Sequence, residues 1–180
     1  LFLNLSHASG AAILDAQGVG LIGASDATAV AQPRITVSDM IVGESDGWVD
    51  IVVSLSAPGQ NTVTVDYRTA DSSASDYYGD YVGNRGTLTF AQGETTKVVR
   101  VQIGDDTNAE GFEQFGFVLS SPTNATIASP TALIGIVDDD TVVATPSLFV
   151  RDVTVDEKAG TASFVVLLGG PSGEASDDTV

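Results

Sequence analysis

The sequence of 180 residues contains no cysteine, one histidine and only seven lysines and arginines. The absence of cysteine excludes disulfide bonds, thiolate–metal sites and a cysteine nucleophile. The 24 acidic residues give a formal net charge of −17, which argues against partners that need a basic surface, namely nucleic acid and anionic membranes. The chain also has no apolar run of about 18 residues, so we expect no membrane insertion of this segment.

Apolar residues are nevertheless plentiful, and two stretches of the sequence occur twice. The stretch Leu3–Ser6 is matched by Phe117–Ser120, and Ile35–Glu44 is matched by Leu148–Glu157. The offset is 113 for the second pair, from position 44 to position 157. A period of this length is that of a whole domain and predicts separate domains in tandem, not a solenoid of short units.

The repeat divides the chain into one complete unit and two partial units. In chain order we assign the C-terminal part of a preceding repeat (1–27), a linker (28–33), a complete repeat (34–140), a linker (141–146) and the N-terminal part of a following repeat (147–180). The chain does not begin with Met, and both ends read as interrupted strands, so we expect a segment of a longer chain. The partial repeats are then either truncated domains or contacts through which copies form a homopolymer.

Alternation of apolar and polar residues with a period of two runs through the complete repeat and predicts strands. The segments are 35–42, 48–55, 62–68, 87–90, 98–103, 114–120 and 132–137. No segment has a sustained helical period. Seven short strands in a unit of this length predict an all-β fold, an antiparallel β-sandwich of immunoglobulin-like architecture.

Successive strands of such a sandwich run in opposite directions, so every second loop lies at the same end; we call this rule strand parity. It predicts that most of the loop acids gather at one end, which we call the acidic pole. The first–second, third–fourth and fifth–sixth loops share a pole with the end of the last strand, whereas the other loops hold only Glu94. The acids at the shared pole are Glu44, Asp46, Asp71, Asp76, Asp80, Asp105, Asp106, Glu110, Glu113, Asp138, Asp139 and Asp140. Crowded carboxylates repel one another unless a cation with a preference for oxygen ligands lies between them. Asp46 and Asp71 also suit simple turn positions.

With these residues in view, the repeat resembles a Calx-beta domain. The motifs that carry the resemblance are Glu44, Val65-Asp66-Tyr67-Arg68-Thr69-Ala70-Asp71, Gly79-Asp80-Tyr81, Gly86-Thr87-Leu88-Thr89-Phe90-Ala91-Gln92-Gly93-Glu94, Asp105–Glu113 with Phe115, and Asp138-Asp139-Asp140. The preceding repeat ends in Gly23-Ala24-Ser25-Asp26, so its copy of the terminal acidic motif is degenerate.

The resemblance implies bound Ca²⁺, with more than one ion, and a set of ligands. These are Glu44, Asp80, Asp105, Asp106, Glu110, Glu113, Asp138, Asp139 and Asp140. Asp76 competes with Asp80 as a ligand, and we prefer Asp80 for its spacing to Gly86-Thr87. Zinc or copper would require histidine or cysteine, and residues 34–140 have neither.

We therefore expect a calcium-binding structural or adhesive repeat of a large secreted or cell-surface protein or filament, from a bacterium, located outside the cell. Calcium would stiffen the domain and its junction with neighbouring repeats. The alternative is a regulatory calcium sensor of a membrane transporter. The sole histidine, His7, lies in a predicted loop, and we expect no enzyme. The exposed-looking Tyr77, Tyr78 and Tyr81 suggest a contact with a glycan or protein adhesion target, although loop tyrosines more often only cover their loop.

Overall fold

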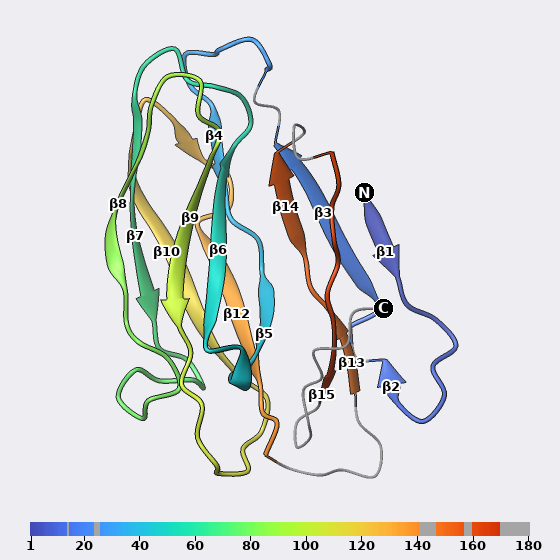
Figure 1. The fold of residues 1–180 in the computed structure, drawn as a ribbon. Helices are drawn as coiled ribbons and strands as arrows, with labels where there is room; N and C mark the ends of the chain where they lie inside the picture. Colours follow the sequence, from blue (N-terminus) through green and yellow to red (C-terminus); the bar gives the residue numbers. More distant parts are fainter. Residues whose placement is uncertain (14, 24–25, 141–146, 157–159, 170–180) are drawn as a thin grey trace.

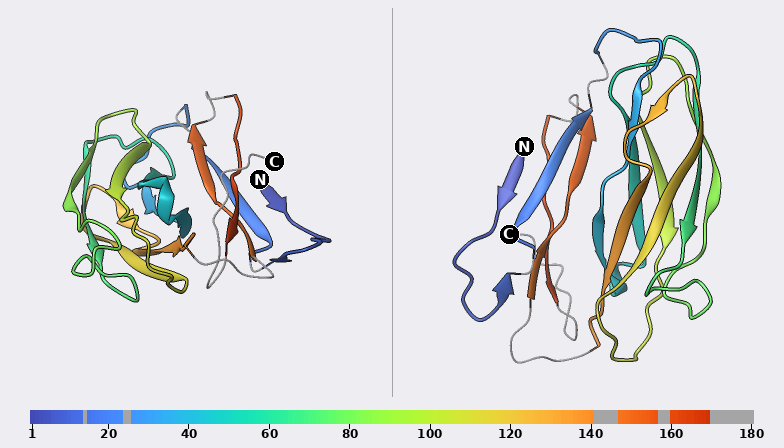
Figure 2. Two further views of the ribbon diagram at one scale, coloured as in Figure 1. Left: turned by 60° about the horizontal axis from the view of Figure 1, so that its bottom comes forward. Right: turned by 180° about the vertical axis from the view of Figure 1, so that it is seen from behind.

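The computed structural model of the chain describes residues 1–13, 15–23, 26–140, 147–156 and 160–169. These residues form two groups of β-strands that lie side by side (Figure 1). Figure 2 shows the two groups tilted, with the lower end of Figure 1 brought forward, and from behind. We call them the large body and the small body. Nowhere do the described residues form a helix with the length and apolar character needed to cross a membrane.

The large body contains the complete repeat and is a sandwich of two sheets. Its strands are β4 (Arg34–Thr36), β5 (Met40–Gly43), β6 (Trp48–Leu55), β7 (Val63–Ala70), β8 (Arg85–Phe90), β9 (Thr96–Gln102), β10 (Glu113–Thr123), β11 (Thr126–Ile127) and β12 (Thr131–Val137). One sheet has the order β5-β12-β10-β7-β8, and the other has the order β11-β4-β6-β9. The predicted all-β sandwich is thereby confirmed.

The first predicted strand of the repeat is divided between the two sheets, and a short strand that was not predicted, β11, precedes the last one. The predicted strand 35–42 becomes β4 in one sheet and β5 in the other, and both pair in parallel with the end of the repeat, β4 with β11 and β5 with β12. Asp39 lies where the chain crosses between the sheets, and its Oδ1 accepts a hydrogen bond of 2.8 Å from the Leu133 backbone N–H. This crossing and the additional strand β11 explain why the large body has nine strands and not the predicted seven.

The core lies between the two sheets and is formed by the predicted inward positions. In β6 the residues Val49, Ile51, Val53 and Leu55 are buried, while the residues between them are not. Two aromatic pairs contribute to this core: Tyr67 stacks on Phe117 with ring centroids 5.5 Å apart, and Tyr81 stacks on Phe115 at 4.1 Å. Burial of these large apolar surfaces is the dominant stabilising contribution to the sandwich.

The expectation of three exposed tyrosines is wrong for Tyr81, which is 2% exposed, and correct for Tyr77 and Tyr78, which are 87% and 80% exposed. Tyr81 forms an isolated bridge with Ile103, and this pairing draws its ring into the core beneath the loop. Sequence alternation could not detect the burial because Tyr81 stands outside a regular strand. Tyr77 and Tyr78 remain a surface pair, edge to face at 5.2 Å.

The small body is built from both ends of the chain. The N-terminal segment supplies β1 (Phe2–Asn4), β2 (Ala12–Ile13) and β3 (Gln17–Gly23), and the C-terminal segment supplies β13 (Ser147–Val150), β14 (Val153–Asp156) and β15 (Val166–Gly169). The sheet orders are β1-β3-β14 and β15-β13-β2. The two partial repeats therefore share sheets and do not stand as separate domains. Each has unpaired backbone groups along its strands, and pairing with the other satisfies them.

The two bodies touch through a small apolar cluster and one ion pair. The ring of Phe112, from the loop between β9 and β10, stacks on Phe149 of β13 with centroids 5.9 Å apart and planes at 8°. Phe149 is buried together with Val137. The Arg151 guanidinium forms an ion pair with Asp46. These contacts all lie next to residues of the acidic pole.

Candidate metal centre

The acidic pole is formed by four segments at one end of the large body, the lower end in Figure 1. They are the 3₁₀ helix η1 (Glu44–Asp46) between β5 and β6, the loop between β7 and β8, the loop between β9 and β10, and the end of β12. Strand parity had predicted this grouping, because each segment follows a strand that runs toward the same end of the sandwich.

The 3₁₀ helix η1 places Glu44 inside the pole. The Gly43 backbone N–H donates a hydrogen bond of 2.8 Å to Asp46 Oδ2, and Gly47 ends the turn with a left-handed φ of 73°. The Ile103 backbone N–H then donates to the Gly47 carbonyl at 3.0 Å. Glu44 is thereby held at 6% exposure, which is rare for a carboxylate unless something pairs with it.

A close contact between two glycines brings the β7–β8 loop against the β9–β10 loop. A Cβ atom built on Gly104 would lie 1.9 Å from the Gly79 carbonyl oxygen, so no larger residue fits at that position without backbone movement. The Gly104 backbone N–H also donates to the Asp80 carbonyl at 2.9 Å. This contact sets Asp80 beside the acids that follow Gly104. Sequence reasoning overlooked Gly104, although a glycine directly before Asp105-Asp106 was the available signal.

Six of the nine proposed ligands form two groups of three carboxylates. Glu44, Asp138 and Asp140 make one trio, and Asp80, Glu110 and Glu113 make the other. In each trio, one carboxylate oxygen from every member lies within 4.8 Å of the others. Residues from both trios line one small cavity, with a volume of about 10 Å³, which is the space for a single water-sized occupant.

Asp138 provides a direct test of whether a cation fits the first trio. Its Oδ2 atom is buried and has no hydrogen-bond partner among the described residues. A buried carboxylate oxygen without a donor is costly, yet this one lies with Glu44 and Asp140, which carry the same charge. A cation between the three carboxylates would satisfy Oδ2 and reverse the sign of the repulsion. The residues of this trio therefore fit a hard divalent ion.

The pKa shifts at the pole have the same cause in both trios. Burial raises the pKa of Glu44 to about 7, and the charges of Asp138, Asp106 and Asp140 add to the rise, while a hydrogen bond from the Asp106 backbone opposes it. Burial, with the Asp80 carboxylate beside it, raises the pKa of Glu113 to about 7. The pKa of Glu110 is also raised, by burial and then by Asp80. Without a cation, these carboxylates are forced together at a cost in free energy.

The other three proposed ligands lie around the trios. The Asp106 backbone N–H donates to Glu44 Oε1 at 3.2 Å, while the Asp106 carboxylate accepts a bond of 2.6 Å from the Asn108 N–H. Partial desolvation raises the pKa of the exposed Asp140, and the charges of Asp139 and Asp105 add to the rise. All three are therefore near the first trio without belonging to it, and their role as ligands stays a prediction.

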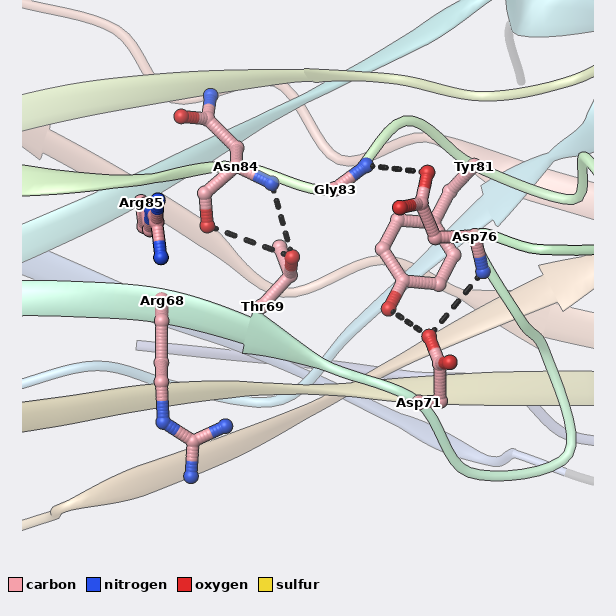
Figure 3. Close-up of a pocket in the computed structure, with 8 residues that line it drawn as sticks. All are labelled: Arg68, Thr69, Asp71, Asp76, Tyr81, Gly83, Asn84 and Arg85. Atoms are coloured by element: carbon pink, nitrogen blue, oxygen red, sulfur yellow. Dashed lines mark hydrogen bonds between the residues drawn. The ribbon is translucent and has the colours of Figure 1, made fainter.

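Asp71 and Asp76, by contrast, serve the geometry of the β7–β8 loop. Asp71 Oδ1 accepts hydrogen bonds from the Tyr81 hydroxyl at 2.5 Å and from the Asp76 backbone at 3.1 Å. Asp76 Oδ1 accepts from the Gly83 backbone at 2.8 Å. Figure 3 shows these side chains lining an open groove with Thr69 and Asn84. Asp80 Oδ2 also accepts a hydrogen bond within this loop, from the Ser75 backbone N–H at 2.7 Å. Asp80 is in addition grouped with Glu110 and Glu113, whereas among the described residues Asp76 belongs to no such group.

The donor set is composed of carboxylate oxygens alone. Such a set suits calcium, which accepts six to eight oxygen ligands in flexible geometry. Magnesium requires a stricter octahedron and usually retains several waters. A larger substrate has no room in the cavity between the trios. The arrangement is therefore chemically that of a small cation cage at the end of a β-sandwich.

Comparison with known families agrees with this class of fold. The Calx-beta domain model matches residues 26–141, more than half of the chain. The chain belongs to the Calx-beta domain family. The matched residues contain the complete repeat, from β4 to the acids that follow β12.

Similar proteins include one extracellular matrix protein and several ion exchangers. Human FRAS1-related extracellular matrix protein 2 is 36% identical over 104 residues, which are 54% of this chain and 3% of that protein. Sodium/calcium exchanger 1 of the rat is 37% identical over 109 residues, 58% of this chain and 11% of the exchanger. The chain thus spans only a small part of the length of these relatives.

Solved structures with a similar fold include domains of Calx. The apo-form Calx CBD1 domain has a TM-score of 0.57 and 30% identity, over 61% of this chain and 99% of that domain. The structure of the calcium binding domain CBD12 of CALX1.1 has a TM-score of 0.56 and 28% identity, over 60% of this chain and 47% of that structure. Both support a Calx-beta sandwich for the large body.

Proposed function

We propose that this chain binds calcium at the acidic pole, through the two carboxylate trios. The observation that carries the proposal is the buried, unpartnered Oδ2 of Asp138 within the trio that also contains Glu44 and Asp140. The similarity to the calcium binding domain CBD12 of CALX1.1 supports the same ion. Two trios support more than one bound ion, with Asp105, Asp106 and Asp139 as further ligands. We assign these acids to ion binding, because the cavity that both trios line has a volume of only about 10 Å³.

Calorimetric titration of the chelator-treated chain with Ca²⁺ tests this role. We expect a calcium-dependent heat in the native chain, strongly reduced in a Glu44→Gln, Glu113→Gln variant that removes one charge from each trio. The matched control is Asp66→Asn, because Asp66 lies on β7 and accepts from Thr87 Oγ1 at 2.6 Å, away from the pole. Equal calcium heats in the native chain and the double variant would contradict the proposal.

We further propose that bound calcium stiffens the junction between the two bodies. The junction contacts come from segments that also carry the proposed ligands. Phe112 lies between Glu110 and Glu113 and stacks on Phe149. Val137 precedes Asp138 and is buried beside Phe149, and Asp46 follows Glu44 within η1 and pairs with Arg151. An ion that orders these segments would therefore order the surface on which the small body rests.

A Phe112→Ala variant separates the junction from ion binding. It keeps every proposed ligand and removes the stacking on Phe149, so we expect calcium to bind without stiffening the junction. Small-angle scattering with and without calcium measures the effect: calcium should narrow the distribution of shapes of the native chain and not that of the variant. The same calcium response in both proteins would show that Phe112 does not transmit the order.

We also propose a biological setting for this chain. It is a structural or adhesive repeat of a larger bacterial protein or filament, located at the cell surface or outside the cell. The match to an extracellular matrix protein supports this setting, and the exposed Tyr77–Tyr78 pair offers a surface for a glycan or protein target. The second candidate is a regulatory calcium sensor within a transporter, favoured by the sodium/calcium exchangers among the relatives. Affinity near micromolar calcium would favour the sensor, and near-millimolar affinity the extracellular repeat.

A further inference from the structure

The strand pairing of the small body repeats that of the large body, residue for residue. A residue of the N-terminal segment corresponds to the residue 114 positions later in the complete repeat, as position 5 does to position 119. A residue of the C-terminal segment corresponds to the residue 113 positions earlier, as position 157 does to position 44. Four ladders can be compared through these offsets. In each ladder, the residues that correspond by these offsets are also paired with each other. The small-body pairs and their large-body counterparts are Leu3 with Gly18 (Phe117 with Ala132), Ala12 with Ser147 (Thr126 with Arg34), Gly20 with Val153 (Ile134 with Met40), and Leu148 with Leu168 (Ile35 with Leu55).

A side-chain hydrogen bond is repeated as well. Asp152 Oδ1 accepts a bond of 2.6 Å from the Val19 backbone N–H. In the large body, Asp39 Oδ1 accepts the corresponding bond of 2.8 Å from Leu133. Register in a sheet is set by which faces the side chains bury, since a slip of one residue reverses every side chain. Two of these ladders, β2 with β13 and β3 with β14, and the hydrogen bond to Asp152 join the two chain ends. Their agreement with the large body therefore reflects specific recognition between the ends.

We infer that the described residues of the segments 1–23 and 147–169 are mutually specific parts of one further sandwich, and that a second copy of this chain can supply either part. Within the small body the two parts are joined only by non-covalent contacts, because the covalent path between them runs through the large body. A partner strand of identical sequence makes identical contacts. Exchange of such an element between copies is domain swapping, which joins chains head to tail.

Among the described residues, the small body also has fewer paired strands than the large body. Its described residues include no counterpart of β7, β8 or β9, so β1 and β15 are the outermost strands of their sheets. Their counterparts β10 and β6 are paired on both sides. Leu1 is 51% exposed and Phe2 is 65% exposed beside the open edge of β1. Opening the small body therefore breaks fewer contacts than opening the large one.

Cross-linking in this cysteine-free chain tests recognition within one copy. Leu21 and Thr154 are partners in the β3–β14 ladder, where neighbouring strands lie about 4.8 Å apart, within the reach of a disulfide. We expect a Leu21→Cys, Thr154→Cys variant to form an intrachain disulfide about ten times faster, or more, than a Leu21→Cys, Thr161→Cys control. Thr161 lies outside the ladder. Equal rates in the two variants would overturn the recognition.

Exchange between copies is tested with the two single variants, one of them carrying a size tag. They are mixed at high concentration in urea, refolded and oxidised, and the large body's unfolding transition confirms that both have folded. We expect a covalent heterodimer in several-fold excess over the two homodimers combined. An Asp152→Ala substitution should reduce that excess. Random pairing of equal amounts gives as much heterodimer as both homodimers combined. A heterodimer that does not exceed this combined amount would overturn the role of the second copy, whatever the calcium measurements show.

Discussion

Removal of calcium should lower the unfolding temperature of this chain, and the drop should be larger at pH 8 than at pH 5.5. With free calcium at about 100 times Kd, each occupied site adds about 2.7 kcal/mol to the free energy of unfolding. For a domain of about 100 residues, that corresponds to about 10 to 20 °C. Thermal scans monitored by circular dichroism, with calcium or with a chelator at each pH, measure the effect.

The pH dependence follows from the raised pKa values of Glu44 and Glu113, both about 7 in the folded chain against an ordinary value of 4.5. A carboxylate whose folded pKa is raised contributes stability below its unfolded pKa and loses that contribution as the pH rises through the folded pKa. The calcium-free chain should therefore lose stability between about pH 4.5 and pH 8. Calcium binds better over the same window, since protons no longer compete for the oxygens.

A Glu44→Gln variant provides the control for this prediction. It removes one negative charge from the first trio and keeps a side chain of nearly equal size. We expect it to unfold at a higher temperature than the native chain in chelator at pH 8, because Asp138 and Asp140 lose a like-charged neighbour. The variant should also gain less from calcium. A calcium gain that is the same at both pH values in the native chain would contradict the assignment of these carboxylates.

Truncation of Phe115 should weaken both the fold and the calcium site. Phe115 is fully buried, and its replacement by Ala should lower the free energy of unfolding by about 3 to 5 kcal/mol. The ring stacks on Tyr81, next to Asp80, and Phe115 follows Glu113 by two positions on β10. One side chain thus supports two of the three carboxylates in the second trio. We expect calcium affinity to fall about tenfold, or about 1.4 kcal/mol.

The matched control for Phe115 is Phe117, the next inward residue of the same strand. Phe117 is equally buried and stacks on Tyr67 at 5.5 Å, but it lies one step farther from the pole. Phe117→Ala should cost a similar amount of stability and leave calcium affinity nearly unchanged. Denaturant unfolding and calorimetry measure the two effects separately, and Phe115→Leu serves where Ala does not fold. Equal affinities for both Ala variants would show that the core does not support the second trio.

Much of the fold and of the pole could be predicted because both depend on local patterns. Alternation predicted the buried face of β6, since successive side chains of a strand point to opposite faces. Strand parity predicted that Glu44, Asp80, Glu110 and Asp138 share one end, and the structure brings them into two trios. The family assignment follows from the same motifs. The roles of individual acids as ligands stay predictions, to be tested by the calcium experiments.

Contacts between distant segments could not be predicted in this way. The burial of Tyr81 depends on its bridge to Ile103, and the position of Asp80 depends on the close approach of Gly104 to Gly79. Neither contact leaves a periodic signal, because each involves single residues in loops. The same holds for Phe112, which the sequence placed among acidic residues and the structure places against Phe149.

The sequence by itself determined the all-β class, the repeat, and the end of the sandwich at which the carboxylates collect, because strand period and chain direction dictate these features. Only the tertiary structure decided that the acids divide into two trios, that Asp138 Oδ2 lacks a donor, and that the two partial repeats join in one small body. Those outcomes depend on the spacing between loops and on backbone edges that must find partners, and only the folded chain defines these distances.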